Sequence, residues 1–152
     1  MKNCTRQLTV RIKIDAPELE VFKRVTNWED QTKWVYLTKV RGVGDDSHKL
    51  GGKLEAFTGI GKIGFLDTMT LTKWEDNKLC EVTHTGNVVK GRGLFEVLTI
   101  DSATYFTWTE YVELPFGFIG RIGWIIVKPI ARLGLWISLK RLKKFIEKSA
   151  YA

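Results

Sequence analysis

Apolar and polar residues alternate near the start of the chain, and the pattern then becomes helical. The alternating apolar positions are Leu8, Val10, Ile12 and Ile14. A period of two is typical of a strand with one buried face. Residues 15–18 carry a proline where a helix can begin, and apolar residues then recur at helical spacing: Leu19, Phe22 and Val25. The sequence therefore predicts a strand, a helix and a second short helix over residues 27–34.

The middle of the chain is a series of strand-like segments separated by turns. Six are predicted, over residues 37–43, 53–58, 65–74, 79–85, 93–100 and 104–114. The breaks between them are rich in Gly, Asp, Asn and Ser, as in Gly51-Gly52 and Asp101-Ser102. Because such short connections join antiparallel neighbours, we expect one antiparallel sheet of about seven strands.

A long helix is predicted after Pro115, ending near Lys148. Its apolar stripe contains Ile130, Leu133, Leu135, Ile137, Leu139, Leu142, Phe145 and Ile146. Pro129 is expected to kink this helix or to mark its true start. The stripe predicts that the helix covers the sheet.

Length and composition indicate one globular domain over residues 1–152. Hydrophobic residues at 44% and charged ones at 27% exclude a disordered, collagen-like or disulfide-built chain. Cys4 and Cys80, with His48 and His84, have no spacing that suits a zinc site, so no metal is expected. No phosphate-binding glycine motif is present, and no cofactor is predicted. The start of the chain has no secretory pattern and no uncharged run is long enough to span a bilayer, so a cytoplasmic location is expected.

The net charge of +7 resides in the last segment of the chain. Residues 121–148 hold eight basic side chains and one acidic one, whereas residues 1–120 hold 16 of each. The first interpretation is a solvated outer face of a helix that packs by its other side. The alternative is contact with phosphates or anionic lipid through Lys140, Arg141, Lys143 and Lys144, with at most weak membrane association and no nucleic acid expected.

The order of elements, with three segments in particular, resembles the SRPBCC superfamily, also called START-related or Bet v 1-like, in its polyketide cyclase/dehydrase and lipid-transport branch. The segments are IDAPELEVFKRVTNWEDQTKW, GRGLFEVLTIDSATYFTWTEYVELP and ISLKRLKKFIEK. The resemblance covers nearly the whole chain. It implies an α+β helix-grip fold, in which a curved antiparallel sheet wraps the C-terminal helix around a hydrophobic cavity. Members include lipid carriers, aromatase/cyclases, ubiquinone-binding proteins and chaperone activators, so the resemblance names no ligand.

Polar residues on apolar strand faces are the candidate site. Glu110 shares a strand face with Phe106 and Trp108, and Glu96 is placed with Leu94 and Leu98. His84 and Asp67 interrupt apolar faces in the same way. A buried carboxylate is costly unless it is paired, so such residues are candidates for ligand contact. A bulge or a wet strand end would instead leave them solvated or locally paired, and we expect one or two to face the cavity.

Aromatic residues complete the predicted site. Trp108 and Phe106 are expected to face whatever fills the cavity. The glycine-rich segment after Leu114 carries Phe116, Phe118 and Ile119, which either gate the pocket or plug the end of the sheet.

Three hypotheses follow for the function. The leading one is a non-catalytic or weakly catalytic binder of a lipid, isoprenoid or aromatic polyketide. The second is a cyclase or dehydratase that uses Glu110 or Glu96 as general base. The third is a membrane-surface or protein-interaction module that uses the basic helix.

Overall fold

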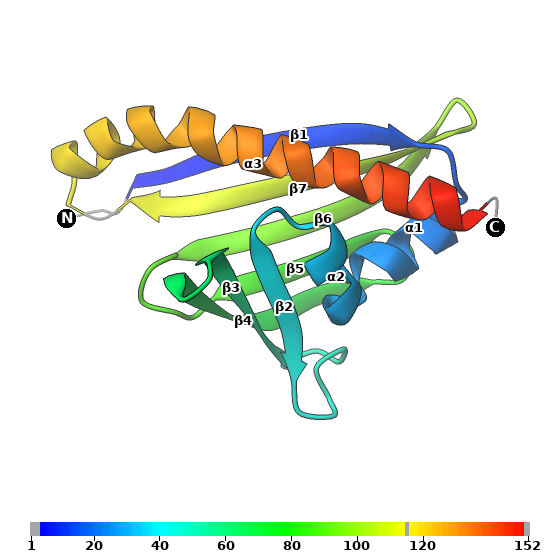
Figure 1. The fold of residues 1–152 in the computed structure, drawn as a ribbon, viewed down its shortest axis with the longest axis horizontal. Helices are drawn as coiled ribbons and strands as arrows, with labels where there is room; N and C mark the ends of the chain where they lie inside the picture. Colours follow the sequence, from blue (N-terminus) through cyan, green and yellow to red (C-terminus); the bar gives the residue numbers. More distant parts are fainter. Residues whose placement is uncertain (1–3, 115, 151–152) are drawn as a thin grey trace.

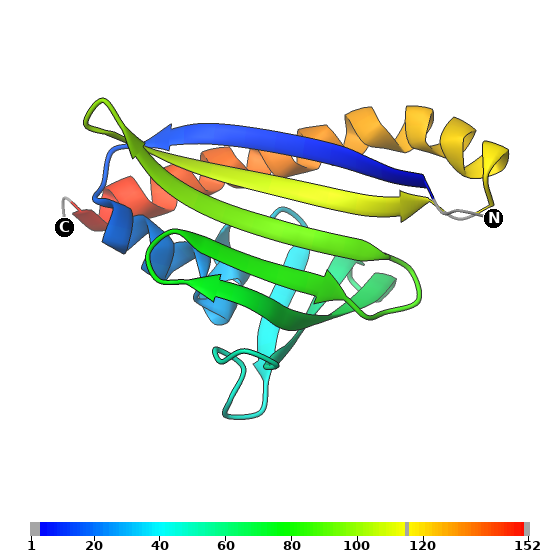
Figure 2. The same cartoon turned by 180° about the vertical axis from the view of Figure 1, so that it is seen from behind.

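A seven-stranded antiparallel sheet forms the body of the molecule, and the helices lie on one side of it (Figures 1 and 2). The computed structural model describes residues 4–114 and 116–150. The strands are β1 (Cys4–Ile14), β2 (Thr38–Val43), β3 (Lys53–Ile60), β4 (Ile63–Glu75), β5 (Leu79–His84), β6 (Gly91–Ile100) and β7 (Ala103–Leu114). The helices are α1 (Glu18–Val25), α2 (Trp28–Trp34) and α3 (Phe118–Ala150). The helix-grip architecture expected from the sequence is confirmed.

The sheet order is β1-β7-β6-β5-β4-β3-β2, so β1 and β2 are the two edges. The two short helices connect these edges, because the chain must cross from one to the other between β1 and β2. Pro17 lies immediately before α1, and Asn27 caps α2 by accepting the Asp30 N–H at 3.0 Å. Local sequence therefore sets where both helices begin.

The core fills the concave side of the sheet. Side chains from β1, β4, β6 and β7 meet α1, α2 and the second half of α3, and the most deeply buried include Ile14, Leu71, Val97, Phe106, Val21, Trp34, Leu139, Leu142 and Ile146. A register shift between Leu71 and Lys73 changes the alternation of β4, so that Trp74 packs edge-on against Phe22 at 5.1 Å. The bulge lies after Asp67 in the sequence. Asp67 therefore still points inward, as the simple alternation predicts.

Helix α3 does not pack against the protein along its whole length, although the sequence predicted that it covers the sheet. It begins at Phe118, eleven residues before Pro129, and the proline lies inside it. One face of its second half is buried in the core, but Ile130 and Leu133, which belong to the predicted core stripe, are 68% and 58% exposed. The expectation that the stripe packs along its full length is therefore wrong: the first half of α3 is apolar on nearly every side, so periodicity could not show which residues pack.

Candidate functional site

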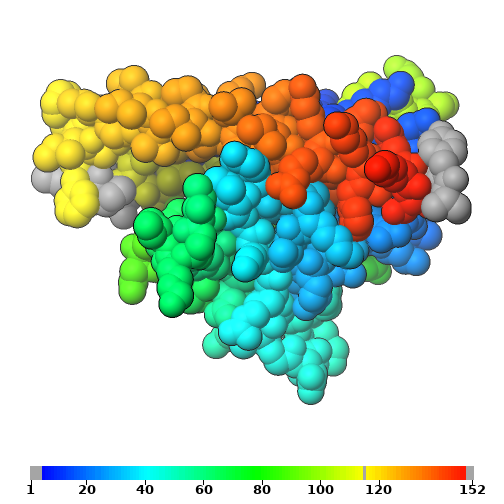
Figure 3. Space-filling model, viewed as in Figure 1, coloured from blue at the N-terminus to red at the C-terminus, as the bar shows by residue number. Residues whose placement is uncertain are grey.

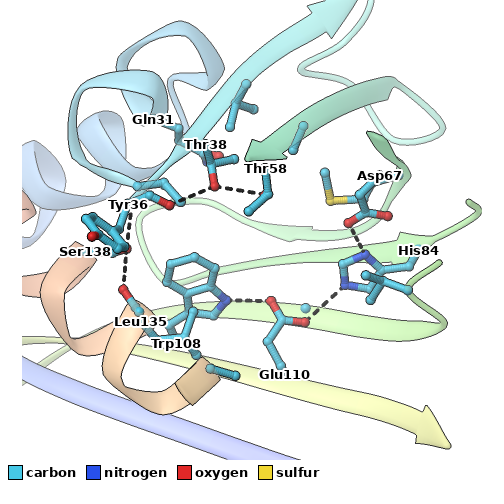
Figure 4. Close-up of a pocket in the computed structure, with 18 of the residues that line it drawn as sticks. Gln31, Tyr36, Thr38, Thr58, Asp67, His84, Trp108, Glu110, Leu135 and Ser138 are labelled. Atoms are coloured by element: carbon cyan, nitrogen blue, oxygen red, sulfur yellow. Dashed lines mark hydrogen bonds and ion pairs between the residues drawn. The ribbon is translucent and has the colours of Figure 1, made fainter. Parts of the chain in front are cut away.

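A cavity of about 540 Å³ lies between the concave face of the sheet, α2 and α3 (Figure 4). Its wall is mostly aliphatic and aromatic, with side chains such as Leu54, Met69, Val82, Phe95 and Leu135. The strands contribute every second residue, because only alternate side chains point to the concave face. The volume falls within the range of small-molecule pockets.

Two aromatic rings of the wall belong to a larger aromatic cluster. Phe95 and Trp108 line the cavity and lie edge-to-face with their ring centroids 5.1 Å apart. Trp34 and Phe106 pack behind them, each within 6.2 Å of a neighbouring ring and fully buried. Edge-to-face packing is a preferred arrangement of aromatic rings, so these contacts favour one orientation for each ring of this wall.

A chain of four polar side chains crosses the apolar wall (Figure 4). His84 Nδ1 lies 2.7 Å from Asp67 Oδ2, and His84 Nε2 lies 3.0 Å from Glu110 Oε2. Trp108 Nε1 donates to Glu110 Oε1 at 2.7 Å. The side chains of Asp67, His84 and Glu110 are 10%, 6% and 17% exposed. These three residues, called the buried triad below, form a charged group inside a mostly apolar cavity.

The charge on His84 is set by its two carboxylate partners. Burial by itself lowers the pKa of the imidazole, but the hydrogen bonds to Asp67 and Glu110, together with their negative charges, raise that pKa from 6.5 to about 10. His84 is therefore an imidazolium at neutral pH, and both ring nitrogens donate. With both carboxylates ionised, the triad carries one net negative charge.

Gly93 makes the triad possible. On β6 it lies opposite Val82 of β5 and Glu110 of β7. A Cβ atom at Gly93 would lie only 2.9 Å from Glu110 Oε1. Because the position has no side chain, the Glu110 carboxylate can cross β6 and reach His84 on β5.

One acceptor of the triad is unused. Asp67 Oδ1 is buried and has no hydrogen-bond partner among the described residues. Leaving a buried acceptor unpaired costs about 1–3 kcal/mol, and more when the group is charged. Asp67 lines the cavity with other parts of its side chain, whereas Oδ1 is closed off from solvent and lies beside Gly86.

Exposed residues of the wall show where the cavity opens. Tyr36 and Leu37, between α2 and β2, face Phe65 of β4 and the α3 residues Ile130 and Leu133 at this opening, called the mouth below. Below it, Tyr36 N donates to Ser138 Oγ at 2.9 Å, which links the α2–β2 connection to α3 (Figure 4). The Thr38 and Thr58 hydroxyls lie 3.0 Å apart on the neighbouring strands.

The structure brings together most of the polar residues that the sequence singled out. Trp108, Glu110, His84 and Asp67 all lie in the cavity wall. Glu96 does not: the inward residues of β6 are Gly93, Phe95 and Val97, so the placement of Glu96 in the site is wrong. Both faces of β6 carry apolar residues, and alternation could not tell them apart. Glu110 is in the cavity, but each of its oxygens already has a hydrogen-bond partner, which does not suit a free general base.

Of the predicted aromatic and apolar site residues, Trp108 lines the cavity and the other four do not. Phe106 is fully buried behind the wall and does not line the cavity. Phe116, Phe118 and Ile119 lie outside the wall with 80%, 71% and 73% of their surfaces exposed, so they neither line the pocket nor plug the sheet. The prediction that these four residues belong to the site is therefore wrong. Their segment leads away from the sheet into the exposed half of α3.

The basic residues proposed as a contact surface are partly engaged within the protein. Lys143 pairs with Glu147 and donates to the Lys13 carbonyl, and Arg141 donates to the Lys33 carbonyl at 2.9 Å. Lys140 lies over the Trp136 ring at 5.5 Å. Lys144 is exposed. These contacts tie the second half of α3 to β1 and α2.

Sequence reasoning missed the contribution of α3 to the cavity. Gly134, Leu135 and Ser138 line it, and no motif distinguishes them from other helical residues. Within the described residues, no group of three or more His, Cys, Asp and Glu side chains is arranged to hold a metal ion.

We expect His84 to keep its proton well above pH 7. In a His48→Gln background, which leaves one histidine, the imidazole nitrogen shifts of His84 should stay those of an imidazolium from pH 6 to pH 8.5. The reason is that both ring N–H groups are held by carboxylates. NMR titration of the folded protein measures this directly, and a midpoint near 6.5 would show that the triad is solvated.

The raised pKa of His84 also makes the stability of the fold depend on pH. A histidine whose pKa is raised on folding stabilises the fold fully below pH 6.5, and this contribution is lost as the pH rises to about 10. Between these limits the free energy of unfolding should fall by up to about 1.4 kcal/mol per pH unit. Burial also raises the pKa of the Cys80 thiol to about 12. The free energy of unfolding should therefore fall further above pH 9, where the thiol ionises only in the unfolded chain. Urea unfolding between pH 6.5 and 8.5 isolates the histidine.

Comparison with known proteins supports the fold. No family model matches the sequence, and no curated protein matches it. Among solved structures, an aromatase/cyclase from Streptomyces sp. R1128, Zhui, superposes with a TM-score of 0.77 at 12% identity, over 97% of this chain and 96% of that one. A protein from Thermus thermophilus gives 0.76 at 13% identity, over 95% and 99%. The Aha1 dimer from Colwellia psychrerythraea gives 0.65 at 18% identity, over 93% and 96%. The chain therefore has the fold of these solved structures, which is the helix-grip fold expected from the sequence.

Proposed function

We propose that this protein binds an apolar small molecule that carries a hydrogen-bond donor, such as a hydroxyl or amine. The observation that carries the proposal is the apolar cavity with the carboxylates of Asp67 and Glu110 in its wall. The cavity wall removes apolar ligand surface from water, which contributes roughly 25 cal/mol per Å². The two carboxylates then favour the orientation that brings the donor of the ligand toward them.

The charge of the triad narrows the class of ligand. Its net negative charge favours a donor and disfavours a carboxylate or phosphate at that end of the cavity. Suitable molecules are a lipid alcohol or amine, an isoprenoid alcohol, or a phenolic aromatic polyketide. The likeness to an aromatase/cyclase supports the last of these. Binding is proposed rather than catalysis, because the two glutamates expected to act as base are either outside the cavity or already hydrogen-bonded.

We expect Gly134→Leu to weaken ligand binding. Gly134 lines the cavity, and a Cβ atom there meets nothing within 4 Å, so a leucine can occupy space that the ligand needs. Titration with Nile red, an uncharged apolar dye, should show at least a tenfold loss of affinity. Both folding and helix content should be kept, because leucine favours a helix more than glycine does.

Gly123→Leu is the matched control. Gly123 lies in the same helix and also has open space around a Cβ atom, but it does not line the cavity. Its substitution should leave dye affinity within twofold of the original. Equal losses in the two variants would place the dye outside the cavity and contradict the proposal.

The same assay tests the donor. 1-Decanol should displace Nile red at a concentration about tenfold or more below that needed by its methyl ether, because a hydrogen bond to a charged group contributes about 1.5–3 kcal/mol. Native mass spectrometry of protein from its own host then identifies a co-purified ligand. Equal competition by the alcohol and the ether would remove the triad from the proposal.

A further inference from the structure

The first half of α3 is an apolar helix with little protein over it. Ile125 and Ile126 are 73% and 63% exposed, and the other large exposed residues of this half are Phe118, Ile119, Ile122, Val127, Ile130 and Leu133. By length and composition α3 meets the criterion for a membrane-crossing helix, and only 11% of its most apolar window is buried. Core helices of soluble proteins meet that criterion while mostly buried. Packing in the protein core therefore does not explain why the first half of α3 is apolar.

The exposed residues form two parallel rows. Phe118, Ile122, Ile125 and Trp136 recur at intervals that place them on one face of the helix. Arg121, Lys128 and Arg132, spaced by seven and four residues, form a row beside it, called the basic row below. The residues of this half that line the cavity, such as Trp124, Ala131 and Gly134, lie mostly on the opposite side. The helix thus presents an apolar face with a basic border to solvent.

The charges of this surface have one sign. No Asp or Glu occurs between Glu113 and Glu147 in the sequence. The three cations of the basic row make no ion pair with any residue in the described ranges. A surface with exposed cations and apolar groups is complementary to anionic lipid, whose headgroups attract Lys and Arg while the acyl boundary accepts apolar side chains.

A second apolar projection lies near the same opening. The β3–β4 hairpin carries Ile60, Ile63 and Leu66, which are 71%, 85% and 50% exposed, with Lys62 in its turn. Figure 3 shows this hairpin (green) and the first half of α3 (yellow to orange) on the same face of the molecule. Both border the mouth through Phe65 and Ile130. Large apolar patches of this kind mark interaction sites on soluble domains.

We propose that the first half of α3, with the β3–β4 hairpin, docks on the surface of an anionic lipid bilayer and places the mouth of the cavity against it. A second copy of the chain is disfavoured, because a symmetric contact would bring two basic rows together with no acidic partner in the helix. A spanning helix is disfavoured because Lys128 would lie within the apolar stretch, where a lysine costs about 2.5–3.5 kcal/mol. The second half of α3 is also held in the core by Leu139 and Leu142. This inference does not depend on what the cavity binds.

Vesicle co-sedimentation tests the proposal with the full chain. Vesicles of phosphatidylcholine with 30% phosphatidylserine should bind the protein at low salt, whereas pure phosphatidylcholine should bind it weakly. The variant Arg121→Gln/Lys128→Gln/Arg132→Gln should lose about 100-fold in affinity, since each basic residue contributes about 1 kcal/mol. Ile125→Asn/Ile126→Asn should lose about as much. Both variants change exposed positions only, so folding should be kept.

The matched control removes the same charge elsewhere on the helix. Arg141→Gln/Lys144→Gln/Lys148→Gln changes three exposed basic residues of the second half and should change vesicle affinity by only a few-fold. Equal losses in the two triple variants would show a general charge effect and overturn the proposal. So would resistance of the bound protein to carbonate extraction, which indicates a spanning helix, or a dimer in sedimentation velocity that is lost in Ile125→Asn/Ile126→Asn. Nile red binding without vesicles is measured in parallel, so a failure of the cavity proposal is seen separately.

Discussion

Replacing His84 by leucine should destabilise the fold by about 3–5 kcal/mol at pH 7, as removal of one partner from a buried ion pair does. The substitution leaves the carboxylates of Asp67 and Glu110 in an apolar wall without the cation that lies 2.7 Å and 3.0 Å from them. Urea unfolding followed by tryptophan fluorescence measures the loss.

A charge-free version of the triad is the control. In Asp67→Asn/His84→Leu/Glu110→Gln the uncompensated charges are gone, and the glutamine oxygen can still accept from Trp108 Nε1. Most of the lost stability should return, because a buried charged group replaced as a whole is often neutral for stability. If His84→Leu costs less than about 1 kcal/mol, water reaches the carboxylates and the triad is not the buried group described here.

This pair of variants also separates stability from function. A triple variant that is stable but no longer distinguishes 1-decanol from its methyl ether would show that the triad serves the ligand rather than the fold. The expected pH dependence should disappear with it, since no group with a raised pKa would remain at residue 84.

Substitution of two leucines in α3 should have very different effects. Leu142→Ala should cost about 2–5 kcal/mol, because its fully buried side chain leaves a cavity in the core. Leu133→Ala should change stability by no more than about 0.5 kcal/mol, because the side chain is 58% exposed. Chemical denaturation of both variants at low protein concentration, without lipid, measures the difference.

The two outcomes have distinct meanings. Similar costs at both positions would show that the first half of α3 packs against protein in solution, which would favour a second copy over a bilayer. A small cost at Leu142 would contradict the assignment of the second half of α3 to the core. The expected contrast instead describes one helix with two roles.

If both proposals hold, the site and the surface work together. The mouth is framed by Tyr36, Leu37 and Phe65 on one side and by α3 on the other. A bilayer against this opening would let an apolar ligand pass between lipid and cavity with little exposure to water, which is the costly step for such a molecule. The donor of the ligand would then reach the triad in the cavity wall.

The sequence determined the elements and much of the site. Alternation placed Asp67, Glu110 and Trp108 on inward faces, because the side-chain period of a strand is fixed by its own backbone. The same rule misled at Glu96, since β6 carries apolar residues on both faces. Helical periodicity identified α3 but not which half of it packs.

Tertiary structure decided which of these side chains meet. His84 finds its partners 17 residues before it and 26 residues after it, on β4 and β7. That meeting depends on the register of four strands and on the missing side chain at Gly93. Tertiary structure also decided which half of α3 packs in the core, and it leaves the first half exposed. Local patterns are set within one segment, whereas register and coverage are set between segments, and only the folded chain brings those together.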